Sequence, residues 1–268
     1  MLMENETLDE LKKWFDDYVA TFKSGDVESD FNVVLKEEHS RRVCREILYI
    51  GENLRLSENN LLLAEIMALL HDIGRFQQYT QYRTFVDHLS VNHAEFGVKI
   101  LREKQTLWRL EELEQDLILR AISYHNRMDL PLDETDRCLM FSRMLRDADK
   151  LDIWQVFTDY YAWQGGASDT TIIHNLPDTP GISDRICADL LAGKTARYGD
   201  AKNLNDFKLL QVGWIFDINF APTFRRIQER DYMAVIRNAL PQSGQVAQIF
   251  SEVQSYLAGF TTDNTEAL

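Results

Sequence analysis

Apolar residues recur at intervals of three and four along nearly the whole chain, which is the spacing of an amphipathic helix. The first repeat runs through Leu8, Leu11, Phe15 and Val19. Further repeats predict helices over residues 30–54, 57–73, 90–101, 113–124 and 140–157. Beyond residue 181 the repeat predicts helices over residues 183–192, 205–219, 222–240 and 242–257. The pattern therefore predicts an all-α fold, with no strand longer than a few residues.

Turn-forming residues mark where several of these helices begin and end. Ser57 suits the N-cap of the helix over residues 57–73, and Gly74 follows as its expected stop. This helix is apolar on nearly every side, so we expect it to be central and buried. Pro222 and Pro241 stand in the expected first turns of the last two helices. Residues 160–181 lose the repeat, and we expect a long loop or lid there.

Composition supports a helical globular protein and excludes several kinds of partner. Of the 268 residues, 45% are hydrophobic, which suffices for a sizeable core, while 12 glycines and 5 prolines are too few for a turn-dense β-sandwich or barrel. The 43 acidic and 29 basic residues give a net charge of −14. That charge opposes an extended nucleic-acid groove and an anionic membrane surface. A small anionic substrate requires a local reversal of this charge.

The cysteines and the apolar runs predict where the protein resides. Cys44, Cys138 and Cys187 are widely spaced, odd in number and outside any CxxC motif, so we expect reduced thiols packed in a core. The first ten residues lack the features of a signal peptide. No apolar run reaches the roughly 18 residues of a membrane span. We therefore expect a cytoplasmic protein without a membrane partner.

Four of the six histidines lie on the apolar faces of the predicted helices. They are His39, His71, His93 and His125, and Asp72 directly follows the second of them. An unpaired polar group on such a face costs roughly 1–3 kcal/mol, so each residue needs a partner. A single buried histidine is most simply a hydrogen-bonded core residue. Four of them with a carboxylate indicate a transition-metal site. His88 and His174 lie in aperiodic segments, where His88 could line the mouth of a pocket.

The surroundings of these residues resemble the H…HD…D signature of the HD-domain superfamily of metal-dependent phosphohydrolases. His39-Ser-Arg-Arg-Val43 is similar to the family's H-S-x-R-V opening, and Leu69-Leu-His-Asp-Ile-Gly-Arg75 to its L-L-H-D-I-G-K segment. Residues 90–97 and 121–125 resemble the segments that supply two more histidines in dinuclear members. The resemblance implies two divalent metal ions, such as iron or manganese. Their implied ligands are His39, His71, Asp72, His93, His125 and Asp149.

The resemblance also implies an HD-domain helical bundle over residues 31–157. We expect residues 1–30 to form an N-terminal helix packed on this core. Residues 158–268 should form a C-terminal helical extension within the same globule, and a homodimer surface could lie there.

The implied activity is hydrolysis of a phosphoester, such as a nucleotide or cyclic nucleotide, by a hydroxide that bridges the two metals. Asp72 and Arg75 are the expected catalytic residues, with Arg75 also contacting the phosphate in place of the family's usual lysine. Further substrate contacts are expected from His88, Asn126 and Arg127. The G-Y-P motif of cyclic-di-GMP phosphodiesterases is absent after His125, which argues against that substrate.

The sequence leaves open two other function classes and the identity of one ligand. The same six ligands are shared by mixed-valence di-iron oxygenases that act on polyols or phosphonates. A non-catalytic HD module that binds a nucleotide is the third function class. Among the ligands, the helical rotation brings Asp152 nearest the apolar face, whereas the family's A-D-x-x-D pattern favours Asp149 over Asp147 or Asp152.

Overall fold

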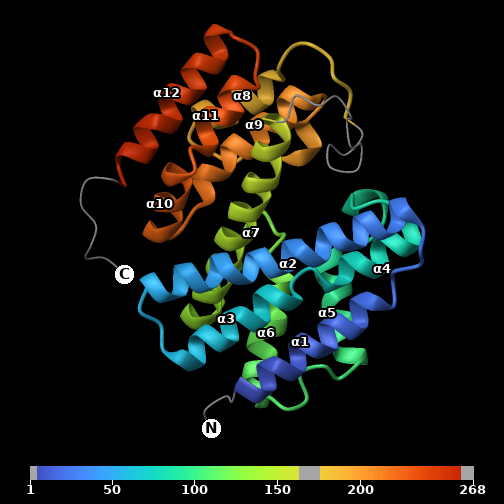
Figure 1. Cartoon of the computed structure of the whole chain (residues 1–268). Helices are drawn as coiled ribbons and strands as arrows, with labels where there is room; N and C mark the ends of the chain where they lie inside the picture. Colours follow the sequence, from blue (N-terminus) through green and yellow to red (C-terminus); the bar gives the residue numbers. More distant parts are fainter. Residues whose placement is uncertain (1–4, 163–175, 261–268) are drawn as a thin grey trace. The chain divides into compact units, whose positions relative to one another are not determined.

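The computed structural model describes residues 5–162 and 176–260, and these residues form helices joined by short connections, without a strand among them (Figure 1). The all-α prediction is thereby confirmed. The chain divides into two compact units, residues 1–152 and residues 153–268. The division falls inside helix α7, five residues before the boundary expected at residue 157. The assignment of both parts to one globule stays a prediction.

The first unit is a bundle arranged around one buried helix. Its helices are α1 (Asn5–Ala20), α2 (Val27–Asn53), α3 (Glu58–Leu70), α4 (Ile73–Tyr82), α5 (His93–Glu103), α6 (Glu112–Tyr124) and the first part of α7 (Asp136–Ala162). Helix α3 contacts α1, α2 and α6. Leu63, Ile66 and Met67 on α3 are fully buried. The expectation that this helix is central is confirmed.

Side-chain caps fix the beginnings of three helices in this unit. Asp26 accepts a hydrogen bond from the backbone N–H of Ser29 at the start of α2. Ser57 accepts from the N–H of Asn60 at the start of α3, as the sequence predicted. At α5 the cap is Asn92, which accepts from two backbone N–H groups, so this helix begins at His93 and not at the predicted residue 90. These carboxylate, hydroxyl and amide oxygens satisfy N–H groups that have no partner within the helix.

The helix expected over residues 57–73 is wrong at its C-terminal end. Helix α3 ends at Leu70, His71 and Asp72 form a turn, and a new helix, α4, begins at Ile73. Gly74 therefore does not stop a helix but lies in the first turn of α4. A Cβ atom at Gly74 would lie 2.2 Å from the carbonyl oxygen of His93, so the missing side chain lets α4 approach α5 closely. The apolar run continues through the turn, which is why periodicity alone did not show it.

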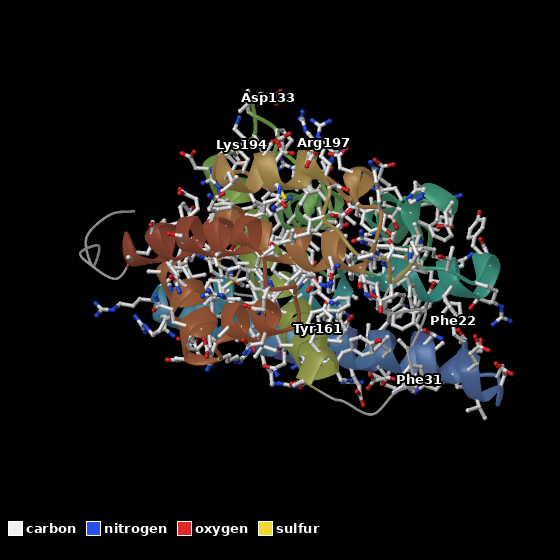
Figure 2. The ribbon with its side chains drawn as sticks, turned by 90° about the horizontal axis from the view of Figure 1, so that it is seen from above. Phe22, Phe31, Asp133, Tyr161, Lys194 and Arg197 are labelled. Carbon is white, nitrogen blue, oxygen red and sulfur yellow. The ribbon has the colours of Figure 1, made fainter. Side chains whose placement is uncertain are left out.

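The described part of the second unit contains the end of α7 and five further helices. They are α8 (Asp184–Leu191), α9 (Leu204–Gly213), α10 (Ala221–Glu229), α11 (Tyr232–Asn238) and α12 (Gly244–Ala258). The indole Nε1 of Trp154 donates to the carbonyl oxygen of Gln211 at 3.0 Å. Tyr161, labelled in Figure 2, donates its hydroxyl to Gln211 Oε1 at 3.1 Å. These bonds attach the end of α7 to α9.

Several predicted boundaries in this unit are wrong. The helix expected over residues 205–219 ends at Gly213 and continues as a 3-10 turn. The helix expected over residues 222–240 is two helices, because Asp231 takes a left-handed conformation with φ of 51°. Pro241 precedes the N-cap of α12, Ser243, and so does not lie in the first turn.

Helix α7 is longer than the predicted 140–157, and its last residues extend into the expected loop. His174 and most of that loop lie outside the described residues. All three cysteines are free and buried, as predicted. No helix in the described ranges has the length and apolar character needed to cross a membrane.

Candidate metal centre

Four imidazole rings converge inside the first unit. His39 lies in the middle of α2, His71 and His125 directly follow α3 and α6, and His93 is the first residue of α5. Each is at most 6% exposed. The Nε2 atoms face one another in two pairs, at 3.2 Å between His39 and His71 and at 2.9 Å between His93 and His125.

The ends of α3 and α6 orient two of these rings. His71 Nδ1 lies 2.7 Å from the carbonyl oxygen of Ala68, and His125 Nδ1 lies 2.7 Å from that of Ile122. A carbonyl oxygen can only accept, so each Nδ1 carries a hydrogen. In the neutral ring the lone pair is then on Nε2, the atom that points into the cluster. The last carbonyls of a helix lack a partner within it, which makes them available for this role.

Carboxylates orient the other two rings. Asp152 Oδ2 accepts from His39 Nδ1 at 2.6 Å, and Asp87 Oδ2 accepts from His93 Nδ1 at 2.7 Å. Arg42 donates from Nε to Asp152 Oδ1 at 2.5 Å. Carboxylates in this position fix the orientation of metal-binding histidines and raise their basicity. All four rings therefore direct Nε2 toward a common centre.

Asp72 and Asp149 bring carboxylate oxygens to the same centre. Asp72 Oδ2 lies 3.5 Å from His39 Nε2 and 3.8 Å from His71 Nε2. Its other oxygen, Oδ1, lies 3.4 Å from His93 Nε2 and 3.9 Å from His125 Nε2. Asp149 Oδ1 lies 3.1 Å from His39 Nε2. The two oxygens of Asp72 thus face different pairs of histidines.

This donor set has the chemistry and spacing of a metal centre. Three groups of donor atoms from these six residues lie within 4.8 Å of one another. Transition-metal–imidazole bonds are about 2.0–2.1 Å long, which places neighbouring donors on one ion about 3 Å apart. The Nε2 pairs at 2.9 and 3.2 Å match that spacing. The lone pairs of two neutral rings repel one another where they face, as the Nε2 atoms of His93 and His125 do, so a shared cation would stabilise that pair.

Burial and charge shift the pKa values of the clustered groups. Burial opposes ionisation of Asp72, but the positive charge of Lys36, followed by His71 and Arg75, holds its pKa well below the usual range. Burial lowers the pKa of His125 to about 3, so this ring is neutral at pH 7. Burial also disfavours charge on His39, yet hydrogen bonds with Asp149 and Asp152 raise its pKa to about 9. Cation binding at His39 is therefore coupled to loss of a proton.

A family model described as HD domain matches residues 37–154. The chain carries an HD domain. The match includes all six clustered residues and ends within α7. No curated protein and no solved structure matches the chain.

Within the HD domain, Arg75 and Asn126 lie beside the cluster. Arg75 Nε is 3.5 Å from Asp72 Oδ1, while its Nη1 donates to Asp87 Oδ1 at 2.9 Å. Asn126 Nδ2 donates to Asp87 Oδ2 at 3.2 Å. Both side chains are thus linked to the carboxylate that orients His93. Their contact with substrate stays a prediction.

His88 and Arg127 are both exposed and lie outside the three donor groups found among the described residues. His88 is exposed in the short 3-10 turn Asp87–Leu89 and belongs to none of the donor groups found in the described residues. Arg127 is exposed, and its guanidinium carbon lies 4.8 Å from the centre of the Tyr124 ring. Substrate contacts from these two residues also stay predictions.

Sequence reasoning did not assign a role to Asp87 or to Lys36. Asp87 lies in an irregular segment six residues before His93, where no periodicity predicts its direction. Lys36 lies three residues before His39, and residues three apart share a helix face, so this spacing was an available signal. Asp152, which the helical rotation had favoured as a ligand, lies behind His39 at Nδ1.

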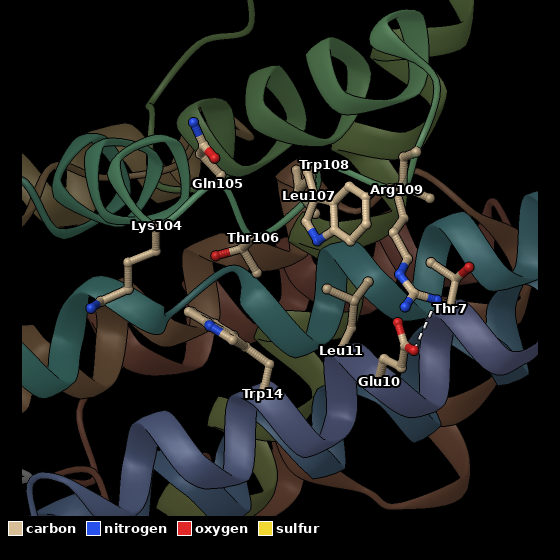
Figure 3. A pocket seen from close by; sticks show the side chains of 11 residues that line it. Thr7, Glu10, Leu11, Trp14, Lys104, Gln105, Thr106, Leu107, Trp108 and Arg109 are labelled. Carbon is tan, nitrogen blue, oxygen red and sulfur yellow. Dashed lines mark ion pairs between the residues drawn. The ribbon is translucent and has the colours of Figure 1, made fainter.

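A separate cavity lies between α1 and the segment that follows α5 (Figure 3). Trp14 and Trp108 line it, and Arg109 forms an ion pair with Glu10 at 2.8 Å. None of the predicted site residues lines this cavity. This cavity is therefore not part of the candidate site, which is the histidine cluster.

Proposed function

We propose that the protein is a metal-dependent phosphohydrolase that hydrolyses a phosphoester, with nucleotides and cyclic nucleotides as the first substrates to examine. The observation that carries the proposal is the position of Asp72. Its two carboxylate oxygens face the His39–His71 pair and the His93–His125 pair separately, at 3.4 to 3.9 Å. A carboxylate in that position suits the sharing of two cations.

The residues divide into two sets of donors. His39, His71 and Asp149 would hold one divalent ion, His93 and His125 would hold the other, and Asp72 would serve both. Two bound ions supply Lewis acidity toward a phosphoryl oxygen and lower the pKa of water toward neutrality. The mixture of imidazole and carboxylate donors suits iron, manganese or zinc.

The chain itself supplies orientation and charge. Asp152 and Asp87 hold two rings in place, and the carbonyl oxygens of Ala68 and Ile122 hold the others. Because five of the six donor residues are buried, water competes weakly for the substrate and electrostatic interactions are strengthened. Arg75 lies beside Asp72 and could stabilise charge that develops on the phosphoryl group.

The proposal is tested by turnover with loaded protein. The full chain is loaded with Mn²⁺ or Fe²⁺ without oxygen and assayed against phosphomonoesters, phosphodiesters, nucleotides and cyclic nucleotides. We expect release of phosphate or of a nucleoside monophosphate, and its loss in Asp72→Ala and His71→Ala. Asp133→Asn, which changes an exposed carboxylate labelled in Figure 2, should keep the wild-type rate.

Three results would contradict the proposal. Loaded protein that cleaves no phosphoester in the panel removes its basis. Oxygen consumption with a mixed-valence di-iron EPR signal, and no anaerobic turnover, would indicate a di-iron oxygenase acting on a polyol or phosphonate. Full function in Asp72→Ala would indicate a nucleotide-binding module instead.

A further inference from the structure

Lys36 reaches the cluster from the edge of the HD domain. It lies one turn before His39 on α2, and its Nζ donates to Asp72 Oδ2 at 2.8 Å. The side chain of Lys36 is 18% exposed, whereas that of Asp72 is 3% exposed. The ammonium group thus lies where the buried carboxylate is approached from solvent.

Lys36 and Arg75 place two positive charges on different oxygens of one carboxylate. Arg75 Nε faces Asp72 Oδ1 at 3.5 Å, and Lys36 contacts Oδ2. The Phe85 ring lies against both cations, with its centre 5.5 Å from Lys36 Nζ and 5.9 Å from Arg75 Cζ. Phe85 is 9% exposed, so the ring is a fixed apolar surface beside both cations.

Lys36 keeps unused capacity to donate hydrogen bonds at the half-buried edge of the cluster. An ammonium carries three N–H donors. Within the described ranges, Asp72 Oδ2 is the one acceptor of a Lys36 hydrogen bond. By contrast, Arg42 donates from both Nε and Nη2 to Asp152. Arg75 Nη1 contacts three acceptors, the Phe85 carbonyl oxygen, Gln78 and Asp87, and the Nε atom of Arg75 is buried without a hydrogen-bond partner among the described residues.

The negative charge of the cluster explains what the unused donors of Lys36 would do. An anionic group that approaches the cluster meets the buried carboxylate of Asp72 and the half-buried carboxylate of Asp149, which repel it. A cation at the same entrance offsets that repulsion. Lysine suits this role because its ammonium is a compact charge on a flexible stem, able to keep Asp72 as a partner while it donates to a second acceptor.

We propose that Lys36 binds the anionic group of the substrate and thereby determines specificity for anionic substrates. The inference rests on the proposed phosphohydrolase function, which makes that group a phosphoryl group. Lys36 is a substrate-binding residue here, while Asp152 and Asp87 position metal ligands.

The test compares Lys36→Met and Lys36→Arg with wild type, using inorganic phosphate as the probe. Calorimetry gives the dissociation constant of phosphate for the metal-loaded full chain, and elemental analysis gives the metal content of each variant. We expect Lys36→Met to keep its metals and to bind phosphate about tenfold or more weakly, the size of one charge-assisted hydrogen bond. Lys36→Arg should restore part of the affinity. The control is Lys99→Met, which removes an exposed lysine on α5.

With any ester that the wild type cleaves, Lys36→Met should raise KM by a similar factor and change kcat less. The inference is overturned if Lys36→Met binds phosphate as tightly as wild type, if wild type binds none, or if the variant loses its metals. Phosphate binding needs no turnover. A wild type that binds phosphate through Lys36 but cleaves no ester would contradict the proposed function alone.

Discussion

At the scale of the residue, the cluster depends on what lies behind each imidazole. Every ring uses Nδ1 to contact an oxygen of the protein and directs Nε2 inward. The histidines and Asp72 could be identified from the sequence, because they lie on apolar faces, where a polar group is costly unless it has a partner. The oxygens behind them could not, since two are backbone carbonyls and Asp87 lies in a segment without periodicity.

Removal of Asp87 should weaken metal binding at the His93–His125 pair. Asp87→Asn keeps the size of the side chain but removes the negative charge that faces His93 Nδ1 at 2.7 Å. Loss of such a carboxylate typically costs about 10- to 100-fold in metal affinity. Titration with Co²⁺, followed by its visible spectrum, should show one weakened site and one unchanged. Two unchanged sites would contradict this role, and Asp133→Asn serves as the control.

Acid should destabilise the metal-free protein through His125. Burial, followed by the positive charges of His93 and His71, lowers the pKa of this ring to about 3, against about 6.5 in an unfolded chain. Between these values the unfolded chain binds a proton that the folded chain does not, so stability is lost as pH falls. His39, whose pKa is raised to about 9, loses its contribution only as pH rises above about 6.5, outside this window.

This pH dependence can be measured by urea unfolding in the presence of a chelator. Between pH 6.5 and pH 5 we expect the free energy of unfolding to fall by about 2 kcal/mol for one fully linked proton. His125→Gln should reduce that fall. An identical pH dependence in the variant and the wild type would show that His125 is not its source.

At the scale of the element, the sequence pattern did not predict the turn between α3 and α4. Periodicity correctly predicted helices at α1, α2, α3, α5 and α6, because each has a continuous apolar face. It extended α3 too far, since Ile73 continues the apolar run and nothing local signals the break at His71. It also missed the left-handed Asp231 between α10 and α11. Both errors arise where tertiary packing or a single dihedral angle overrides the local pattern.

Substitution of Gly74 should damage the fold and the cluster together. A Cβ atom there would lie 2.2 Å from the His93 carbonyl oxygen and 2.7 Å from the backbone nitrogen of Gly97, so α4 and α5 would have to separate. Overpacking of this kind costs about 1–3 kcal/mol. We expect Gly74→Ala to lower the melting temperature and to reduce metal content. Gly244→Ala is the control, because no atom lies within 4 Å of its added Cβ. A stable, fully loaded Gly74→Ala variant would contradict this packing argument.

At the scale of the whole molecule, the six clustered residues all belong to the first unit. The net charge of −14 argues against nucleic acid as a partner class, and that exclusion stays a prediction. What the total charge could not show is that Lys36, Arg42 and Arg75 are paired with Asp72, Asp152 and Asp87 around the cluster. Composition reports a sum, whereas the local balance of charge depends on the fold.

Metal removal should therefore destabilise the first unit and leave the second unit unchanged. A ligand that binds only the folded state stabilises it, so chelation should increase hydrogen exchange in α2, α3, α5 and α6. Peptides from α8 to α12 should exchange at similar rates with and without the chelator. Mass spectrometry of peptides from loaded and chelated protein measures both regions. Equal changes in both units, or none in the first, would contradict the assignment of the metal centre.

The spacing of the donors along the chain has a consequence for synthesis on the ribosome. The donor group His39, His71 and Asp72 has been added once residue 72 is joined, and the group Asp72, His93 and His125 once residue 125 is joined. His39 is made first of all, but Asp149 and Asp152, which face its two ring nitrogens, come more than 100 residues later. For most of the domain's translation His39 therefore lacks the two carboxylates that face its ring nitrogens. The His39 side of the cluster is completed last.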